Sequence, residues 1–218
     1  MNEKLTELVF IVDRSGSMAG MESDTIGGVN AVLEKNREVE GETLVSVVLF
    51  DHETKVLRDR VPIAKVPKLT RDDYQVRGCT ALLDAVGGSV QFIEKIQRYL
   101  PEEIRPAKTI FVITTDGYEN ASRKFSYEAV KRLIEERTKD GWEFLFLGAN
   151  IDAAAEACRI GIAADRAESY FNDVAGSRAM YESVADATVA MNCAPAGAPR
   201  MGSGWKKSIL RDRKRRGL

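Results

Sequence analysis

Oxygen-bearing side chains flank apolar segments at three places in this sequence. Asp13 comes directly after the apolar run at residues 8–12, and Asp116 comes just after the run at 108–114. Thr80 lies immediately before a segment with helical apolar spacing. Carboxylate and hydroxyl oxygens are hard donors, which suit Mg²⁺ or Mn²⁺ better than Zn²⁺. The sequence therefore predicts a divalent-metal site made by Asp13, Ser15, Ser17, Thr80 and Asp116.

The charge of this set indicates a receptor rather than a closed structural site. Asp13 and Asp116 are its only anions, and the three hydroxyls are neutral. Mg²⁺ prefers six ligands and usually keeps water, so the ion retains Lewis acidity and an exchangeable position. A carboxylate from a partner would complete the shell. Gly16, inside the first loop, lets the backbone curl so that the side chains before and after it converge.

The elements that must position these residues alternate along the chain. Continuous apolar runs at 8–12, 44–50, 108–114 and 142–147 are typical of strands buried on both faces. Helical spacing covers 24–39, with Ser23 or Asp24 as cap, and also 81–99, 126–139, 152–159 and 173–191. Residues 54–63 contain Pro62 and predict an exposed edge strand that forms a hairpin with 44–50, and 168–171 predicts a short last strand.

This alternation predicts a doubly wound, Rossmann-like α/β sheet with helices on both faces. In such sheets, ligands bind at the carboxyl ends of the strands, near the point where the strand order switches. All three polar segments fall at that edge.

Three segments of the sequence, LVFIVDRSGSM, GCTALLDAV and IFVITTDGYEN, resemble the defining motifs of the von Willebrand factor type A (VWA) domain. The D-x-S-x-S match is complete at Asp13, Ser15 and Ser17, Thr80 matches the isolated threonine, and Asp116 matches the T-D-G aspartate. The resemblance spans roughly residues 7–171. It implies a six-stranded, mostly parallel sheet with one antiparallel edge strand. It also implies a metal-ion-dependent adhesion site that binds an acidic residue of a protein ligand, often beside an AAA+ ATPase or other assembly component.

Simpler interpretations remain open for several residues. Asp13, Ser15, Ser17 and Asp116 are ordinary turn residues, and Thr80 could cap the helix that follows it. For three further residues we favour the plainer role: Asp84 as a charge at a helix N-terminus, His52 as a solvated hairpin residue, and Cys79, where the family usually has Gly, as a space-filling thiol. Four residues of the surrounding loops could contact a partner or pack within the loops: Met18, Met21, Tyr118 and Asn120.

Three functions compete. The first is a metal-dependent binding module that could act as an adaptor in a multiprotein assembly. It would have no catalytic residues. The second is a metal-dependent phosphatase or phosphotransferase on a similar sheet. Against it, Ser15 stands where the haloacid-dehalogenase pattern needs a second Asp, no Gly-x-x-x-x-Gly-Lys loop is present, and Arg14 is no obvious phosphate clamp. The third is a structural subunit with a vestigial site.

Composition sets the remaining bounds. The 218 residues are 44% hydrophobic and 30% charged, as in ordinary globular proteins. We expect a VWA domain at 1–192, a linker at 193–204 and a basic tail at 205–218. That tail carries seven Lys or Arg against one acid, and its excess of six positive charges leaves −7 for the rest of a chain whose formal net charge is −1. We expect the tail to be solvated, and it suggests nucleic acid only weakly.

The compartment follows from the cysteines and the first apolar run. Three irregularly spaced cysteines, Cys79, Cys158 and Cys193, make a poor disulfide framework. The run at 8–12 is too short for a signal peptide, and no run approaches the ~20 residues of a membrane span. We therefore expect a cytoplasmic protein with reduced thiols and no membrane contact.

Overall fold

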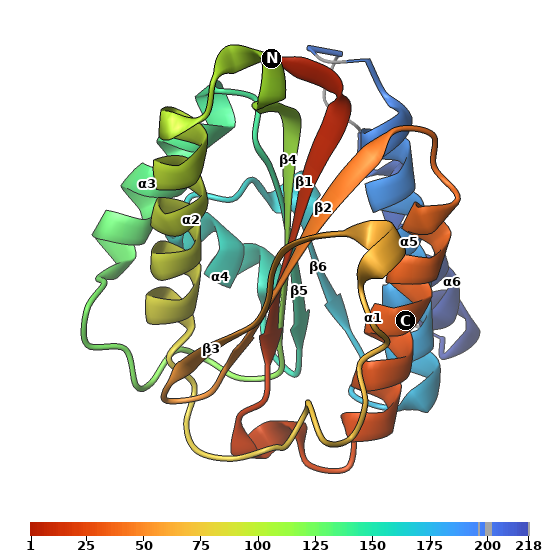
Figure 1. Ribbon diagram of the computed structural model, residues 1–218. Coiled ribbons are helices and arrows are strands. Elements are labelled where there is room, and N and C mark those ends of the chain that lie inside the picture. Colours follow the sequence, from red (N-terminus) through yellow and green to blue (C-terminus); the bar gives the residue numbers. More distant parts are fainter. Residues whose placement is uncertain (196, 199–201, 218) are drawn as a thin grey trace.

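A six-stranded sheet runs through the middle of the computed structural model, which describes residues 1–195, 197–198 and 202–217 (Figure 1). The strands lie in the order β3-β2-β1-β4-β5-β6, and all neighbours are parallel except β2 and β3. The strands are β1 (Asn2–Asp13), β2 (Glu42–Phe50), β3 (Thr54–Pro62), β4 (Pro106–Thr115), β5 (Glu143–Ala149) and β6 (Ala167–Tyr170). The predicted fold, with β3 as its antiparallel edge strand, is confirmed.

Helices cover both faces of the sheet (Figure 1). On one face lie α1 (Glu22–Arg37), α5 (Val174–Cys193) and α6 (Lys207–Arg215). On the other lie α2 (Leu82–Tyr99), α3 (Tyr127–Lys139) and α4 (Ala153–Arg159). Short 3₁₀ turns span Gly16–Met18, Ile63–Lys65, Glu102–Ile104, Ala164–Arg166 and Ser203–Lys206. Successive residues of β1 enter opposite cores, Phe10 packing with the first set of helices and Val9 and Ile11 with the second, because side chains alternate across a strand.

Helix ends differ from expectation where loops intervene. The first helix begins at Glu22, and its N-cap residue is Met21, which makes no side-chain capping bond. The predicted cap at Ser23 or Asp24 is therefore wrong, because a 3₁₀ turn at Gly16–Met18 carries the chain into the helix earlier. Gly141, just past α3, has a φ of +88°, as expected of a residue that ends a helix.

The basic segment after α5 is a packed helix, so the expectation of a solvated tail is wrong. Trp205 and Ile209 are 5% and 1% exposed, within the core that contains α5. Lys206 donates to the carbonyl of Ala167 at 2.5 Å, and Arg213 donates to that of Ser169 at 2.8 Å. These carbonyls belong to β6, an edge strand whose outer backbone groups lack a neighbouring strand.

The linker expected before this segment lies only in part within the described residues. Its residues 196 and 199–201, and residue 218 of the tail, lie outside the described residues. The division of the chain at residues 192 and 204 stays a prediction. Within the described ranges, no helix combines the length and apolar character needed to cross a membrane.

Candidate metal centre

The five predicted ligands gather at the carboxyl edge of the sheet, at its topological switch point. The chain leaves β1 for β2 on one side, and β4 lies on the other side. Asp13, the last residue of β1, is level with Phe50 of β2, and Val12 is level with Thr114 of β4. The loops after β1 and β4 therefore start side by side, as in the ligand-binding crevice of doubly wound sheets.

Asp13 is fully buried and held at three points. Its Oδ1 accepts the backbone N–H of Ser15 at 2.7 Å, and its Oδ2 accepts the hydroxyl of Thr115 at 2.6 Å. Its backbone carbonyl accepts the hydroxyl of Tyr74 at 2.5 Å. The carboxylate is thus fixed in direction before any ion binds, which lowers the ordering cost of binding one.

A chain of hydrogen bonds connects the serines to the second carboxylate. The hydroxyls of Ser15 and Ser17 lie 3.1 Å apart, and the Ser17 hydroxyl donates to Asp116 Oδ1 at 2.5 Å. Asp116 Oδ2 accepts Asn172 Nδ2 at 3.4 Å. Ser15 and Asp116 are buried, whereas Ser17 is exposed. The set is therefore open toward solvent on the Ser17 side.

Thr80 joins this set through the loop that follows β4. Asn120 holds it by a reciprocal pair of bonds: the Thr80 N–H donates to Asn120 Oδ1 at 2.9 Å, and the Asn120 N–H donates to the Thr80 carbonyl at 3.0 Å. A methyl group placed on Gly117 would lie 3.3 Å from Thr80 Oγ1 and 3.6 Å from Ser17 Oγ. The two hydroxyls thus face the same space above Gly117. The alternative role of Thr80 as helix cap is wrong, because the N-cap of α2 is Ala81 and uses no side chain.

The first turn of α2 is instead capped by side chains from the loop after β4. Glu119 Oε2 accepts the N–H of Leu83 at 2.9 Å, and Ser122 Oγ accepts the N–H of Asp84 at 3.0 Å. In return, the Asp84 carboxylate accepts the three N–H groups of residues 123–125 at 2.8–3.0 Å. Asp84 therefore pins a loop, a role more specific than the expected charge at a helix N-terminus.

Arg14 lies away from the proposed ligands and faces Asp51, a carboxylate with no exposed surface. Its Nε is 2.9 Å from Asp51 Oδ2 without the alignment of a hydrogen bond. Arg77 Nε donates to the same oxygen at 2.9 Å, and Arg77 also pairs with Glu53. His52 is half exposed, as expected. Asp51, His52 and Glu53 lie close together, but the arginines already neutralise this cluster, and we assign it no metal.

Among the described residues, the two carboxylates of the proposed centre have no cationic partner. Burial is the largest cause of a raised pKa at Asp13, which reaches about 6. The hydrogen bonds from Thr115 and Ser15 lower this pKa, whereas the charge of Asp116 raises it further. Burial also raises the pKa of Asp116, against its bond from Ser17. No Lys or Arg in the described part of the chain forms an ion pair with either carboxylate. Buried anions require a compensating charge, and a divalent cation among oxygen donors fits that requirement.

Other loop residues divide between packing and exposure. Met18 is 3% exposed, so it packs within the loops, and Met21 is half-buried. Tyr118 is 53% exposed, and its hydroxyl accepts the N–H of Asp152 at 3.5 Å. Cys79 is exposed, so the expectation of a space-filling thiol is wrong. Asn120 is exposed, and its side-chain oxygen accepts the backbone N–H of Thr80.

Sequence reasoning missed Thr115 and Asn172. Thr115 precedes Asp116 at the end of β4, and its hydroxyl orients Asp13. Asn172 follows β6 and reaches Asp116. Each lies at or just after the carboxyl end of a strand, which was a usable signal. Thr115 is also the threonine of the T-D-G motif, whereas Asn172 belongs to no motif.

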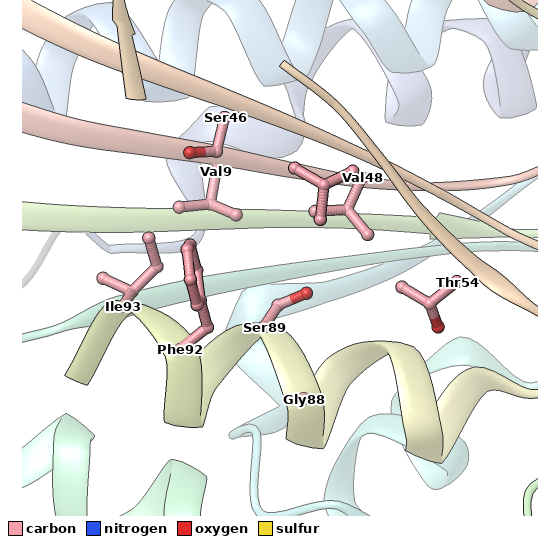
Figure 2. A pocket seen from close by; sticks show the side chains of 9 residues that line it. Val9, Ser46, Val48, Thr54, Gly88, Ser89, Phe92 and Ile93 are labelled. Atoms are coloured by element: carbon pink, nitrogen blue, oxygen red, sulfur yellow. The ribbon is translucent and has the colours of Figure 1, made fainter. Parts of the chain in front are cut away.

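A separate hollow of about 250 Å³ lies between the sheet and α2 (Figure 2). Val9 and Val48 line it from the sheet, and Phe92 and Ile93 line it from the helix. Apolar groups dominate its lining. It offers neither a titratable group nor a ligand set, so we place no chemistry there.

Comparisons with known proteins agree with this architecture. The family described as VWA domain containing CoxE-like protein matches residues 2–157. A search of curated proteins found no match. Among solved structures, proximal thread matrix protein 1 from the mussel byssus, with a zinc-occupied MIDAS motif, is 16% identical over 88% of this chain and 47% of its own, with a TM-score of 0.59. This chain thus spans about half the length of the mussel protein.

Two further solved structures share the fold. Manganese-loaded TRAP protein of Plasmodium vivax is 14% identical over 78% of this chain and 70% of its own, with a TM-score of 0.56. The VWA domain of SpRpn10 is 13% identical over 90% of this chain and 98% of its own, with a TM-score of 0.54. At these identities the likeness establishes the fold alone, whereas the family match spans most of the sequence. The chain belongs to the family of VWA domains, in the group that contains CoxE-like proteins.

Proposed function

We propose that this protein binds a partner protein through a divalent ion held by Asp13, Ser15, Ser17, Thr80 and Asp116. VWA domains typically act as metal-dependent protein-interaction modules, and most are not enzymes. The observation that carries the proposal is the convergence of two buried, cation-free carboxylates with three hydroxyls at one sheet edge. A bound ion supplies Lewis acidity there, and a carboxylate of the partner completes its shell.

Mg²⁺ or Mn²⁺ is the proposed ion. All five side chains offer oxygen, and hard oxygen donors favour these ions over Zn²⁺. The solved relatives carry zinc in the mussel protein and manganese in the Plasmodium protein, so both ions serve as probes. Thr115 and the Ser15 N–H would keep the Asp13 carboxylate oriented, and Gly117 would leave free the space that the Thr80 and Ser17 hydroxyls face.

The partner is a protein that supplies a Glu or Asp side chain, and we place this chain as an adaptor in a multiprotein assembly such as one built around an AAA+ ATPase. We further propose a cytoplasmic location, because the three cysteines are free and exposed, which suits a reducing compartment. The enzyme alternative gains no support from Arg14, since it faces Asp51 rather than the proposed ion.

The decisive test compares Asp13→Ala with Asp59→Ala, a matched loss of one carboxylate on the exposed surface of β3. Calorimetry should detect Mn²⁺ binding to the wild type and to Asp59→Ala, and none to Asp13→Ala. Capture of a partner from native extract should require Mg²⁺, fail in EDTA and fail for Asp13→Ala. A folded wild type that binds neither ion would instead support a structural subunit with a vestigial site. Phosphoester turnover that vanishes in Asp13→Ala would support the enzyme.

A further inference from the structure

The basic C-terminal segment uses only part of its charge to attach itself to the domain. Lys206 pairs with Glu168 at 3.2 Å, and Arg213 pairs with the same carboxylate at 2.8 Å. Arg216 pairs with Asp173 at 2.6 Å. These three cations, together with the buried Trp205, anchor α6 along β6 and α5.

Four cations of α6 remain outside this anchorage. They are exposed and form no ion pair within the part of the chain that the structure describes: Lys207, Arg211, Lys214 and Arg215. Residues spaced by three, four, seven and eight share one face of a helix. The helix therefore turns Ile209 and its anchoring residues inward and presents a basic face outward, on which Leu210 is also exposed.

A groove of about 580 Å³ runs between this helix and α5. Arg211 and Arg215 line it from α6, and Val174 and Arg178 line it from α5. Its two acids are already engaged, Glu182 with Arg178 and Asp212 with Arg216. The exposed side chain of Val174, 66% accessible, gives the groove an apolar contact among positive charges.

This groove adjoins the candidate metal centre through a continuous set of contacts. Arg216 holds Asp173, the residue just before Val174. On the other side of Asp173, Asn172 donates to Asp116 of the centre. A protein segment whose carboxylate reaches the ion therefore needs only a few more residues to enter the groove.

We propose that the basic face of α6 and its groove bind an acidic segment of the same partner whose carboxylate reaches the metal, an inference that rests on the proposed function. Charge complementarity favours an anionic occupant, and two features favour a protein over a nucleic acid. Val174 and Leu210, both about half exposed or more, offer apolar contacts that a phosphate backbone does not use. The nearby aromatic rings are unavailable for base stacking, since Trp205 is buried and Arg216 covers Phe171.

A defined probe tests this surface. The probe is a fluorescent synthetic peptide of about twelve residues in which Glu alternates with Leu, long enough to extend roughly 40 Å. The variant is Arg211→Glu with Arg215→Glu in the full chain. The matched control is Lys95→Glu with Lys139→Glu, two exposed lysines on α2 and α3 that lie on the opposite face and change the net charge equally.

We expect the α6 variant to bind the peptide at least about tenfold more weakly than the wild type at low ionic strength, because two contacts become repulsions. The control should change binding less than about twofold. Both variants should keep the wild-type circular dichroism spectrum and Mn²⁺ affinity. An equal loss in both variants would overturn the proposal, since it would reflect net charge alone.

Two other occupants have their own signatures, and either would overturn the proposal. Tighter binding of a duplex DNA of similar length, lost in the same variant, would identify a nucleic-acid surface. Concentration-dependent dimerisation that the α6 variant abolishes would identify the acidic body of a second copy.

Asp13→Ala separates this inference from the proposed function. If both hold, Mn²⁺ strengthens peptide binding, Asp13→Ala removes that gain, and the α6 variant removes the metal-independent part. Peptide binding that depends on α6 but never on metal would sink the proposed function and, with it, the claim of a shared partner. Peptide binding that depends on metal but is unchanged in the α6 variant would overturn this inference alone.

Discussion

At the scale of single residues, the candidate centre depends on two carboxylates kept in an unfavourable environment. Asp13 is fully buried and Asp116 is 5% exposed, and each is held by hydroxyl or amide donors rather than by a cation. Such donors orient a carboxylate without neutralising it. A protein gains from an ion at such a place, because the ion replaces lost hydration for both anions at once.

Metal binding should weaken as the pH falls through about 6, because the pKa of metal-free Asp13 is raised to about 6 by burial. A protonated carboxyl must release its proton before it binds the ion, so affinity should fall up to about tenfold for each pH unit below that value. Mn²⁺ titrations by calorimetry in matched buffers of pH 5 to 8 would measure it. An affinity that is constant across that range would contradict the assignment of Asp13 as a ligand.

Gly117→Ala should weaken Mn²⁺ binding while it leaves the fold intact. The added methyl group would stand 3.3 Å from Thr80 Oγ1 and 3.6 Å from Ser17 Oγ, within the space that these hydroxyls face. Gly88→Ala is the matched control, because a methyl group there meets nothing within 4 Å and should stabilise α2 by roughly 0.5–1 kcal/mol. Calorimetry and urea denaturation separate the two effects. Equal Mn²⁺ affinities of the two variants would show that the ion binds elsewhere.

At the scale of elements, loops and helix ends support each other across the sheet edge. The loop after β4 caps α2 through Glu119 and Ser122, and α2 returns Asp84 to that loop. Thr80 lies between them and is held by Asn120. The backbone of the threonine is therefore positioned by two elements at once, which fixes the point from which its hydroxyl reaches the site.

The packing of α6 can be measured by a pair of neighbouring substitutions. Ile209→Ala should lower the free energy of unfolding by about 2–4 kcal/mol, because its side chain is 1% exposed and packs in the core with α5. Leu210→Ala, one residue further on and 49% exposed, should cost less than about 0.5 kcal/mol. Urea denaturation of both variants gives the comparison. Two small and equal effects would mean that α6 does not stay packed in solution.

At the scale of the whole molecule, buried acids set how stability varies with pH. Burial, the largest cause, raises the pKa of Glu7 from 4.5 to about 7 despite its pairing with Arg60, and raises that of Asp13 from 3.8 to about 6. Between the unfolded and folded values the native state binds more protons than the unfolded state. Stability therefore falls as the pH rises across that window. The pKa of Asp173 is lowered to about 2, mainly by Arg216, so this residue changes the stability only at lower pH.

The metal-free protein should accordingly be more stable near pH 5.5 than near pH 7.5, and Glu7→Gln should reduce the difference. Mn²⁺ should raise the stability more at the higher pH, by about 2.7 kcal/mol at one hundred times its dissociation constant. Thermal or urea denaturation at the two pH values, with EDTA or Mn²⁺, measures both effects. Stability that rises steadily from pH 5.5 to 7.5 in EDTA would contradict the raised pKa values.

The sequence by itself determined the six strands, the helices α1 to α5 and the choice of candidate ligands, but not α6. A continuously apolar strand is buried on both faces when helices cover both sides of the sheet, so such runs identified the central strands. Because these strands are parallel, the loops after residues 12 and 115 lie at the same edge of the sheet. Patterns of this kind are local, because each depends on residues within one strand or one loop. The five proposed ligands come from such local patterns, and the structure brings all five together.

Only the tertiary structure decided which distant groups support those ligands. Asn172 reaches Asp116 across 56 positions of sequence, and Thr115 reaches Asp13 across 102. The cap of α2 and the docking of α6 likewise depend on partners far along the chain. The hydrogen-bond partner of a side chain depends on which surfaces pack together. A basic segment is predicted to be solvated from its sequence, because the carbonyls and carboxylates that anchor it belong to β6 and to the N-cap of α5.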